Sequence, residues 1–228
     1  MINKHAIVAI DGPSGSGKST ISRMLAHKLG FTYLDTGAMY RAVGLKAKRA
    51  GIDLDDTEAL AVMLKDIEIH LAPKSNDDVR VFLDGEDVSA EIRTAEMGMV
   101  ASKVSANMAV RKKLTKLQQD MGRKGAIVAE GRDMGTVVFP GADFKFFLDA
   151  SPEERARRRC EQLKQRGEEA DYQEILEQIT KRDEDDSSRA LAPLKPAKDA
   201  IIVDSSKMNP DEVLAFMIQC FKREFGVL

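Results

Sequence analysis

The stretch that most constrains the fold is GPSGSGKS, residues 12–19, which directly follows the apolar run AIVAI at 6–10. It matches the pattern G-x-x-x-x-G-K-[ST] in full, a pattern that belongs between a strand and a helix. In such a loop the glycines let successive backbone N–H groups surround a phosphate, and the helix N-terminus adds positive potential. We therefore predict a parallel α/β core and a nucleoside triphosphate site at the end of its first strand.

The residue types in this loop indicate separate roles. Lys18 has the reach to contact β- and γ-phosphate oxygens, and the Ser19 hydroxyl is placed to ligate Mg²⁺. ATP and Mg²⁺ are therefore the expected cofactors. The complete predicted nucleotide-binding loop comprises Gly12, Pro13, Ser14, Gly15, Ser16, Gly17, Lys18, Ser19 and Thr20.

Short apolar runs rich in Val, Ile or Phe alternate with helical patterns along much of the chain. This alternation predicts buried parallel strands joined by right-handed βαβ connections. Ser151 and Glu154 form a capping box at one helix start, with Pro152 in its first turn. Strands are expected at 6–10, 32–35, 126–130, 144–149 and 200–204, and helices at 18–29, 37–50, 152–166, 171–188 and 209–224.

One region has a different period. Residues 66–72 and 78–89 alternate apolar and polar side chains, are separated by the polar SNDD, and contain the turn signal Asp84-Gly85. We predict a small antiparallel sheet of two or three strands there, followed by helices at about 92–106 and 107–122. The expected organisation is a core of residues 1–62 and 107–228 with a short helical lid at about 153–170, and an inserted acceptor-binding subdomain at 63–106.

Charge and cysteine content exclude some classes of protein. The chain has 35 basic and 37 acidic residues, a formal net charge of −2, which argues against a protein that coats polymeric nucleic acid. Cys160 and Cys220 form no metal or disulfide pattern, and no apolar run is long enough to span a membrane. We expect a cytoplasmic protein with reduced cysteines, and a monomer, since no long apolar face calls for a partner.

Other P-loop classes fit the sequence poorly. A GTPase would need an Asn-Lys-x-Asp motif, which the sequence lacks. An ATPase of the motor type would need a strand that ends in Asp-Glu, whereas FFLD ends in Asp149 followed by Ala150. What the chain has instead is a large supply of arginines at predicted strand ends and in late helices.

Two strand ends carry charge that a core element does not need. LDTGAMYR places Asp35, Thr36 and Arg41 at a helix start, and EGRDMG places Arg132 and Asp133 directly after a strand. In doubly wound sheets ligands bind beyond the carboxyl ends of the strands, so these residues are candidates for a second, acceptor site. From spacing alone, a helix cap at Asp35 with a solvated Arg41 fits as well.

Two late arginine groups allow the same pair of interpretations. Arg182, Asp186 and Arg189 lie four and three residues apart and share one helical face. Arg155, Arg158 and Arg159 share another. Each group fits either a solvent-facing ion-pair stripe or a set of phosphate ligands, the second group as part of a mobile lid.

In combination these motifs resemble the bacterial cytidylate kinases over essentially the whole chain. The resemblance rests on DGPSGSGKST, LDTGAMYR, EGRDMGTVVFP, FFLDASPEER and RALAPLKPAKDA occurring in that order. It implies an adenylate-kinase-like P-loop core with an enlarged acceptor domain that carries an antiparallel sheet. The implied reaction is transfer of the γ-phosphate of ATP to CMP or dCMP, in pyrimidine nucleotide metabolism.

The resemblance also implies residue roles. Lys18, Arg132, Arg158 and Arg189 would be catalytic, although which of Arg155, Arg158 and Arg159 contacts the transferring phosphate stays open. Gly131 and Gly135 would allow close approach of the nucleotide, and Glu130 would pair with an arginine. The acceptor phosphate would be bound by Thr36, Arg41, Arg132 and Arg189, the cytosine by Ser102, Arg111 and Asp133, the sugar by Arg182 and Asp186, with Asp35 also substrate-binding.

Two alternatives remain. The chain could be another P-loop kinase that phosphorylates a different nucleotide or a metabolite hydroxyl, in which case a titrating base is needed. It could also be a nucleotide-dependent switch that binds ATP without turnover, although a switch does not need an acceptor site.

Overall fold

The computed structural model describes residues 5–74 and 79–225, and its centre is a five-stranded parallel sheet in the order β2-β6-β1-β7-β8. All five strands were predicted, each to within one residue. The central strand β1 pairs with β6 on one side and β7 on the other. The strands are β1 (Ile7–Asp11), β2 (Thr32–Asp35), β6 (Ile127–Gly131), β7 (Phe144–Asp149) and β8 (Ile201–Asp204).

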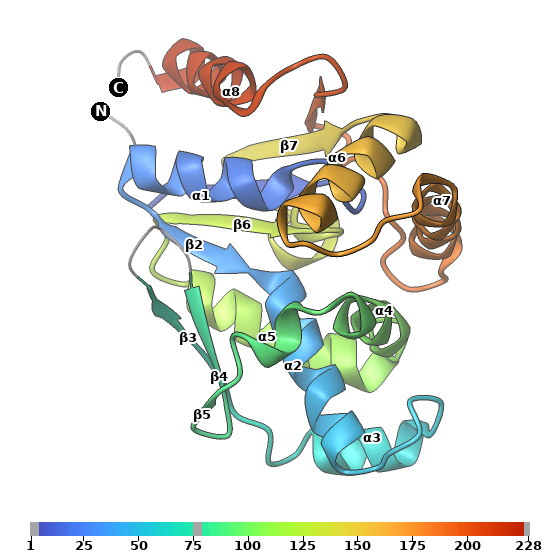
Figure 1. The fold of residues 1–228 in the computed structure, drawn as a ribbon. Helices are drawn as coiled ribbons and strands as arrows, with labels where there is room; N and C mark the ends of the chain where they lie inside the picture. The colour runs from blue at the N-terminus through green and yellow to red at the C-terminus, as the bar shows by residue number, and fades with distance from the viewer. Residues whose placement is uncertain (1–4, 75–78, 226–228) are drawn as a thin grey trace.

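Helices cover both faces of this sheet (Figure 1). Val8 and Ile10 of β1 pack into the layer formed by α1 (Lys18–Leu29) and α8 (Pro210–Phe225). Ala9, pointing to the other face, packs with residues of α2 (Thr36–Arg49) and α5 (Met108–Gly122). Burial of the sheet on two sides explains why its strands read as continuous apolar runs.

The predicted antiparallel sheet is present and has three strands. These are β3 (Ile69–Pro73), β4 (Val79–Leu83) and β5 (Glu86–Asp87), with the polar stretch 75–78 lying outside the described residues. Asp84 and Gly85 form the turn between β4 and β5, both with positive φ (50° and 86°). The Asp-Gly signal therefore correctly located a turn that needs left-handed backbone.

The helices around the small sheet differ from the prediction in two places. A helix α3 (Thr57–Met63), capped by Asp56, was not predicted. The single helix expected at 92–106 is a short 3₁₀ turn (Glu91–Arg93) followed by α4 (Ala95–Val104). The Thr94 side chain accepts a hydrogen bond from the N–H of Met97 and starts α4 anew, which divides the segment.

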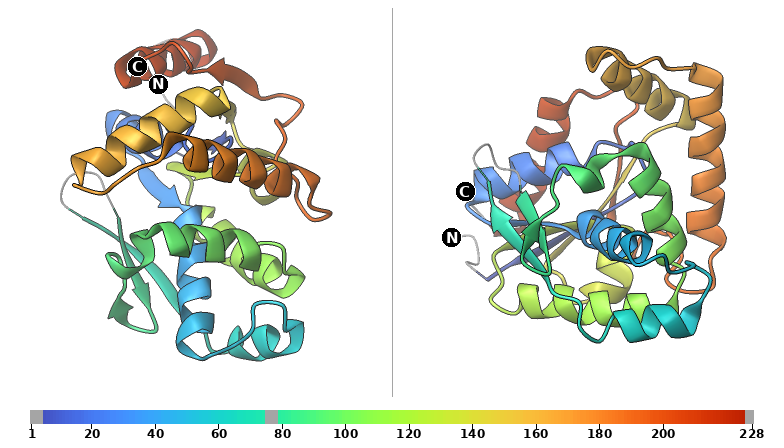
Figure 2. Two further views of the ribbon diagram at one scale, coloured as in Figure 1. Left: turned by 45° about the vertical axis from the view of Figure 1, so that its right-hand side comes forward. Right: turned by 60° about the horizontal axis from the view of Figure 1, so that its bottom comes forward.

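The predicted lid and the late arginines lie on or directly after α6 (Pro152–Gln165) and α7 (Tyr172–Ser188), which share a small apolar cluster. Figure 2 shows α7 extending from α6 along the side of the molecule to the level of α3 and α4. The capping box at α6 is only half formed. Ser151 Oγ accepts from the N–H of Glu154 at 3.2 Å, but the N–H of Ser151 donates to Ser206 and the Glu154 carboxylate binds Arg157 and Arg158.

One hydrophobic cluster runs from the parallel sheet through α2 and α5 to the small sheet. The division into a core and an inserted 63–106 subdomain stays a prediction. Within residues 5–74 and 79–225, no helix combines the length and apolar character needed to cross a bilayer.

Candidate active site

The loop between β1 and α1 has the backbone of an anion-binding nest. Gly12, Gly15 and Gly17 have φ values of 147°, 80° and 92°, which side-chain-bearing residues rarely adopt. A Cβ on Gly12 would lie 2.0 Å from the carbonyl oxygen of Leu148, so glycine is required there for steric reasons as well. Gly17 precedes α1 without a side-chain cap, and the N–H groups at the helix start face the loop.

Lys18 is the first residue of α1 and is only 6% exposed. Its Nζ donates to the carbonyl oxygen of Pro13 at 2.5 Å and to Ser16 Oγ at 3.3 Å, both neutral oxygens. Burial, and secondarily the positive charge of Arg132, lower the pKa of Lys18. A buried cation beside neutral oxygens is typical of a site that binds a polyphosphate.

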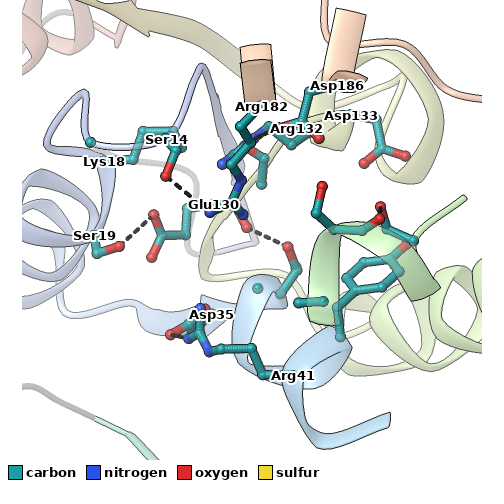
Figure 3. A pocket seen from close by; sticks show the side chains of 18 of the residues that line it. Ser14, Lys18, Ser19, Asp35, Arg41, Glu130, Arg132, Asp133, Arg182 and Asp186 are labelled. Atoms are coloured by element: carbon teal, nitrogen blue, oxygen red, sulfur yellow. Dashed lines mark hydrogen bonds and ion pairs between the residues drawn. The ribbon is translucent and has the colours of Figure 1, made fainter. Parts of the chain in front are cut away.

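A single pocket connects this loop with the carboxyl ends of the strands (Figure 3). Ser14 and Lys18 lie on one side of it and Asp133 on the other, with Arg132 and Arg182 between them. Every predicted substrate-binding residue lines the pocket, together with four loop residues. They are Asp35, Thr36, Arg41, Ser102, Arg111, Arg132, Asp133, Arg182, Asp186 and Arg189, and Ser14, Gly15, Lys18 and Ser19. The other predicted residues do not line this pocket: Gly12, Pro13, Ser16 and Gly17 form the loop, and Thr20 lies in α1.

The lining carries an excess of positive charge, with six cationic side chains against four carboxylates. Burial, together with nearby Arg132 and Arg41, lowers the pKa of Arg182 to about 10. Buried guanidinium nitrogens of four pocket arginines have no hydrogen-bond partner in the described structure: Nε of Arg41, Arg111 and Arg182, and Nη2 of Arg189. Such donors and uncompensated cations are the expected lining of a site for phosphate groups.

The carboxylates hold the arginines in place. Asp186, 4% exposed, accepts from Arg132 Nε at 2.8 Å and lies 3.4 Å from Arg189 Nη1. Burial alone would raise the pKa of Asp186, but Arg132, together with Arg182 and Arg189, outweighs burial and lowers this pKa below its usual range. Arg111 and Asp133 form a second buried pair at 2.8 Å. The ion pairs expected around Asp186 therefore exist, but they are buried and face the pocket instead of solvent.

Asp35 caps a helix, as one interpretation of its motif predicts, and it also lies in the pocket, where its substrate-binding role stays a prediction. Its carboxylate accepts from the N–H of Ala38 at 2.8 Å, which caps α2, and it also pairs with Arg41 at 3.2 Å. Both side chains line the pocket. The hydroxyl of Thr36 donates to the carbonyl oxygen of Glu130 at 2.6 Å and so joins the start of α2 to the end of β6.

The predicted lid arginines behave differently from one another. Arg155 is 2% exposed, donates to the carbonyl oxygens of Ala150 (2.8 Å) and Ser14 (3.0 Å), and pairs with Asp183 on α7. The solvent-facing stripe is therefore the wrong interpretation for Arg155. Arg158 binds Glu154 and the carbonyl oxygen of Ser205. It does not line the pocket, and its catalytic role stays a prediction.

Two expectations for EGRDMG need correction, those for Glu130 and Gly135. Glu130 was expected to pair with an arginine, but its carboxylate accepts from Ser19 Oγ at 3.0 Å and from the Tyr33 hydroxyl. Gly131 lines the pocket, and its close approach to the nucleotide stays a prediction. A Cβ on it would also meet the side chains of Met134 at 2.8 Å and Thr36 at 2.9 Å. Gly135 faces Lys145 and does not line the pocket.

The site also contains residues that were not predicted from the sequence. Tyr40 lines the pocket, with the Arg111 guanidinium carbon 5.7 Å from its ring centre, and burial raises the pKa of Tyr40 to about 12. Ser105 accepts from Arg189 at 3.3 Å and donates to the carbonyl oxygen of Ser102 at 2.7 Å. Tyr40 lies within the LDTGAMYR motif, one turn after Thr36, which is a signal that could have found it. Ser105 carries no such signal.

A phosphate-binding loop that opens onto a cationic pocket at the carboxyl ends of parallel strands defines a phosphotransferase of the P-loop kinase class. The family model described as cytidylate kinase matches residues 8–223. The chain belongs to the cytidylate kinase family.

Known proteins resemble the chain over nearly its whole length. A cytidylate kinase from Geobacter sp. (strain M21) is 50% identical over 220 residues, which cover 96% of this chain and 94% of that protein. One from Pasteurella multocida is 48% identical over 227 residues, covering 100% and 99%. Among solved structures, an uncharacterized protein from Eubacterium ventriosum has a TM-score of 0.50 at 12% identity, covering 95% of this chain and 98% of that one. This last likeness concerns the fold alone.

Proposed function

We propose that the chain is a nucleoside monophosphate kinase that transfers the γ-phosphate of ATP to CMP or dCMP, giving ADP and CDP or dCDP. One observation supports this most. A single pocket has Lys18 and Ser19 of the P-loop at one end and the buried Arg111–Asp133 pair at the other, with Arg132 and Arg182 between them. Donor phosphates and an acceptor nucleotide bound at these ends would bring their phosphates together among the arginines.

The acceptor supplies its own nucleophile in this reaction. A phosphate monoester has a second pKa near 6 and is largely dianionic at neutral pH, so no general base is required. The work of the protein is then to hold two anions together and to neutralise the charge of the moving group. In our proposal Lys18, Arg132 and Arg189 do this, Thr36 and Arg41 bind the acceptor phosphate, and Arg158 joins from the lid.

A buried pair of opposite charge suits the cytosine edge. Cytosine donates from N4 and accepts at N3 and O2, so Asp133 would accept from N4 while Arg111 and Ser102 bind the acceptor atoms. Uracil has an oxygen in place of the amino group, and it would face the Asp133 carboxylate with no proton between them. Arg182 and Asp186 would hold the sugar in a manner that permits both CMP and dCMP.

Mg²⁺ fits the residues at the donor end. The Ser19 hydroxyl lies 3.0 Å from a Glu130 carboxylate oxygen, and both are the oxygen ligands that Mg²⁺ prefers. Within the described residues there is no group of three or more His, Cys, Asp or Glu side chains that could hold an ion, so phosphate oxygens of ATP and water would provide its other ligands. Ser19, with Glu130 behind it, would hold the ion, which would neutralise charge on the β- and γ-phosphates.

Water must be kept from the γ-phosphate, or the enzyme would hydrolyse ATP. In our proposal the lid at about 153–170 closes over the donor site. Arg155 already ties α6 to Ser14 of the P-loop and to Asp183 of α7. We further propose that the enzyme works in the cytoplasm, where its nucleotide substrates are, and acts as a monomer.

The nature of the acceptor group separates this function from a metabolite kinase. Supplied with Mg-ATP and either CMP or cytidine, the enzyme should convert CMP to CDP and leave cytidine unchanged, because the pocket arginines need a phosphate and a hydroxyl needs a base. Chromatographic identification of the products, with ATP alone as the control, gives the answer. Conversion of cytidine to CMP at a rate comparable with CDP formation would contradict the proposal.

A further inference from the structure

Asp11 occupies a central position that the proposed mechanism does not use. It is the last residue of β1, directly before Gly12 of the P-loop, and lies in register between Gly131 of β6 and Phe147 of β7. It is 3% exposed and does not line the pocket. A carboxylate at the end of a buried central strand is costly unless it is satisfied by hydrogen bonds.

Both carboxylate oxygens of Asp11 accept backbone hydrogen bonds from the opposite side of the site. Oδ1 accepts from the N–H of Met134 and Oδ2 from the N–H of Gly135, each at 2.8 Å. These N–H groups open a single π-helical turn at Met134–Val138. Asp11 is therefore the anion at the N-terminus of that turn, where free N–H groups and the local dipole favour negative charge.

The turn directly follows two proposed acceptor-site residues. Asp133, whose φ and ψ of −146° and 23° lie outside the regular regions, pairs with Arg111, and Arg132 pairs with Asp186. The direction of both side chains depends on the backbone that Asp11 holds. Since the residue after Asp11 begins the phosphate-binding loop, one carboxylate fixes the two halves of the pocket to each other.

We propose that Asp11 is a positioning residue for the monophosphate acceptor. Asp11 anchors the turn that orients Arg132 and Asp133, and this anchored turn holds the acceptor site against the P-loop. This inference rests on the proposed function. Asp11 touches neither the pocket nor any reacting group, so it acts only through the turn.

Asp11→Asn tests this geometry with almost no change in volume. An amide has one accepting oxygen, so its NH₂ group would face one of the two backbone N–H donors and that bond would be lost. We expect the KM and the Kd for CMP to rise about tenfold or more, while the KM for ATP changes less than about twofold.

Asp143→Asn is the matched control. The Asp143 carboxylate accepts from the N–H of Ile7 at 2.8 Å, at the opposite end of the same strand. This variant makes the same carboxylate-to-amide change at a side chain that binds the backbone of β1, but through one oxygen only, which the amide can replace. It should leave the constants for CMP and ATP unchanged. A role of Asp11 in the fold alone would move the CMP and ATP constants together, or neither, and either result would overturn the inference.

Amide hydrogen exchange covers the case in which Asp11→Asn does not fold. In the wild-type protein, saturating CMP should slow exchange at Met134 and Gly135, because the acceptor tightens the turn below it. Unchanged exchange at both amides would overturn the inference. The two proposals can fail separately. If the wild-type enzyme phosphorylates no CMP, the proposed function is wrong. If Asp11→Asn turns over CMP with unaltered constants, only the positioning role is wrong.

Discussion

Replacing Lys18 with alanine should abolish phosphoryl transfer, with a fall in kcat of about 10³-fold or more. The Lys18 ammonium is buried beside the loop and hydrogen-bonded only to the neutral oxygens of Pro13 and Ser16, so a bound triphosphate would be the natural partner of its charge. Without Lys18, the loop would no longer place a cation beside the negative charge of the phosphoryl group in transfer. Single-turnover measurement of ADP formation with saturating CMP reports the loss directly.

The same substitution should not unfold the protein, which makes the result interpretable. Burial lowers the pKa of Lys18, so the folded state is an unfavourable place for this charge in the absence of nucleotide. We therefore expect a melting temperature at or above that of the wild type. Lys28→Ala, at the exposed far end of α1, is the matched control and should keep full activity. A Lys18→Ala enzyme with near-wild-type kcat would contradict the site described here.

Arg132→Ala should cost at least about 2–3 kcal/mol of transition-state stabilisation, or about 30- to 150-fold in kcat/KM. Its Nε is occupied by Asp186 at 2.8 Å, while the guanidinium lies between the P-loop side and the Asp133 side of the pocket (Figure 3). From that place it can contact both the acceptor phosphate and the group in transfer. Steady-state kinetics with CMP and ATP varied in turn measures the cost.

Two further variants separate charge from geometry at Arg132. Arg132→Lys keeps the charge but loses the planar fork, and we expect it to recover only part of the loss. Arg123→Ala, at the end of α5 with a side chain that is 75% exposed, removes an arginine from the surface and should leave kcat/KM unchanged. Arg132→Ala with wild-type kcat would show that the pocket does not use this side chain in transfer.

The parts of the fold that depend on local sequence patterns were predictable. Burial on both faces makes β1, β6 and β7 mostly apolar, with charged residues chiefly at their carboxyl ends, and the P-loop glycines are required by the backbone of the loop. The small sheet followed from its period of two and from Asp84-Gly85. Helix α3 was missed because it is short, with Leu60 as its one buried residue, too little for a periodic signal.

Contacts between distant segments were not predictable from residue types. Charge spacing placed Arg155 on a helix face, but only the fold brings Asp183 and Ser14 to it. Likewise, the sequence does not reveal that Asp11 binds the turn after Asp133, more than a hundred residues away along the chain. For Asp35 the helix cap and the pocket position were offered as alternatives, and the structure shows both, because a helix N-terminus lies at the edge of the pocket there.

The most direct test of the proposed activity is a coupled ADP-release assay with Mg-ATP and, in separate reactions, CMP, dCMP, UMP, AMP and GMP. We predict turnover with CMP and dCMP well above that with the other three, because cytosine places its N4 donor toward Asp133 and its N3 and O2 acceptors toward Arg111. Uracil has an oxygen where cytosine has N4, and the purines are larger. Preferred turnover of UMP or of a purine nucleotide would contradict the base-reading role of this pair. ADP release that none of the five acceptors stimulates would contradict the proposed activity as a whole.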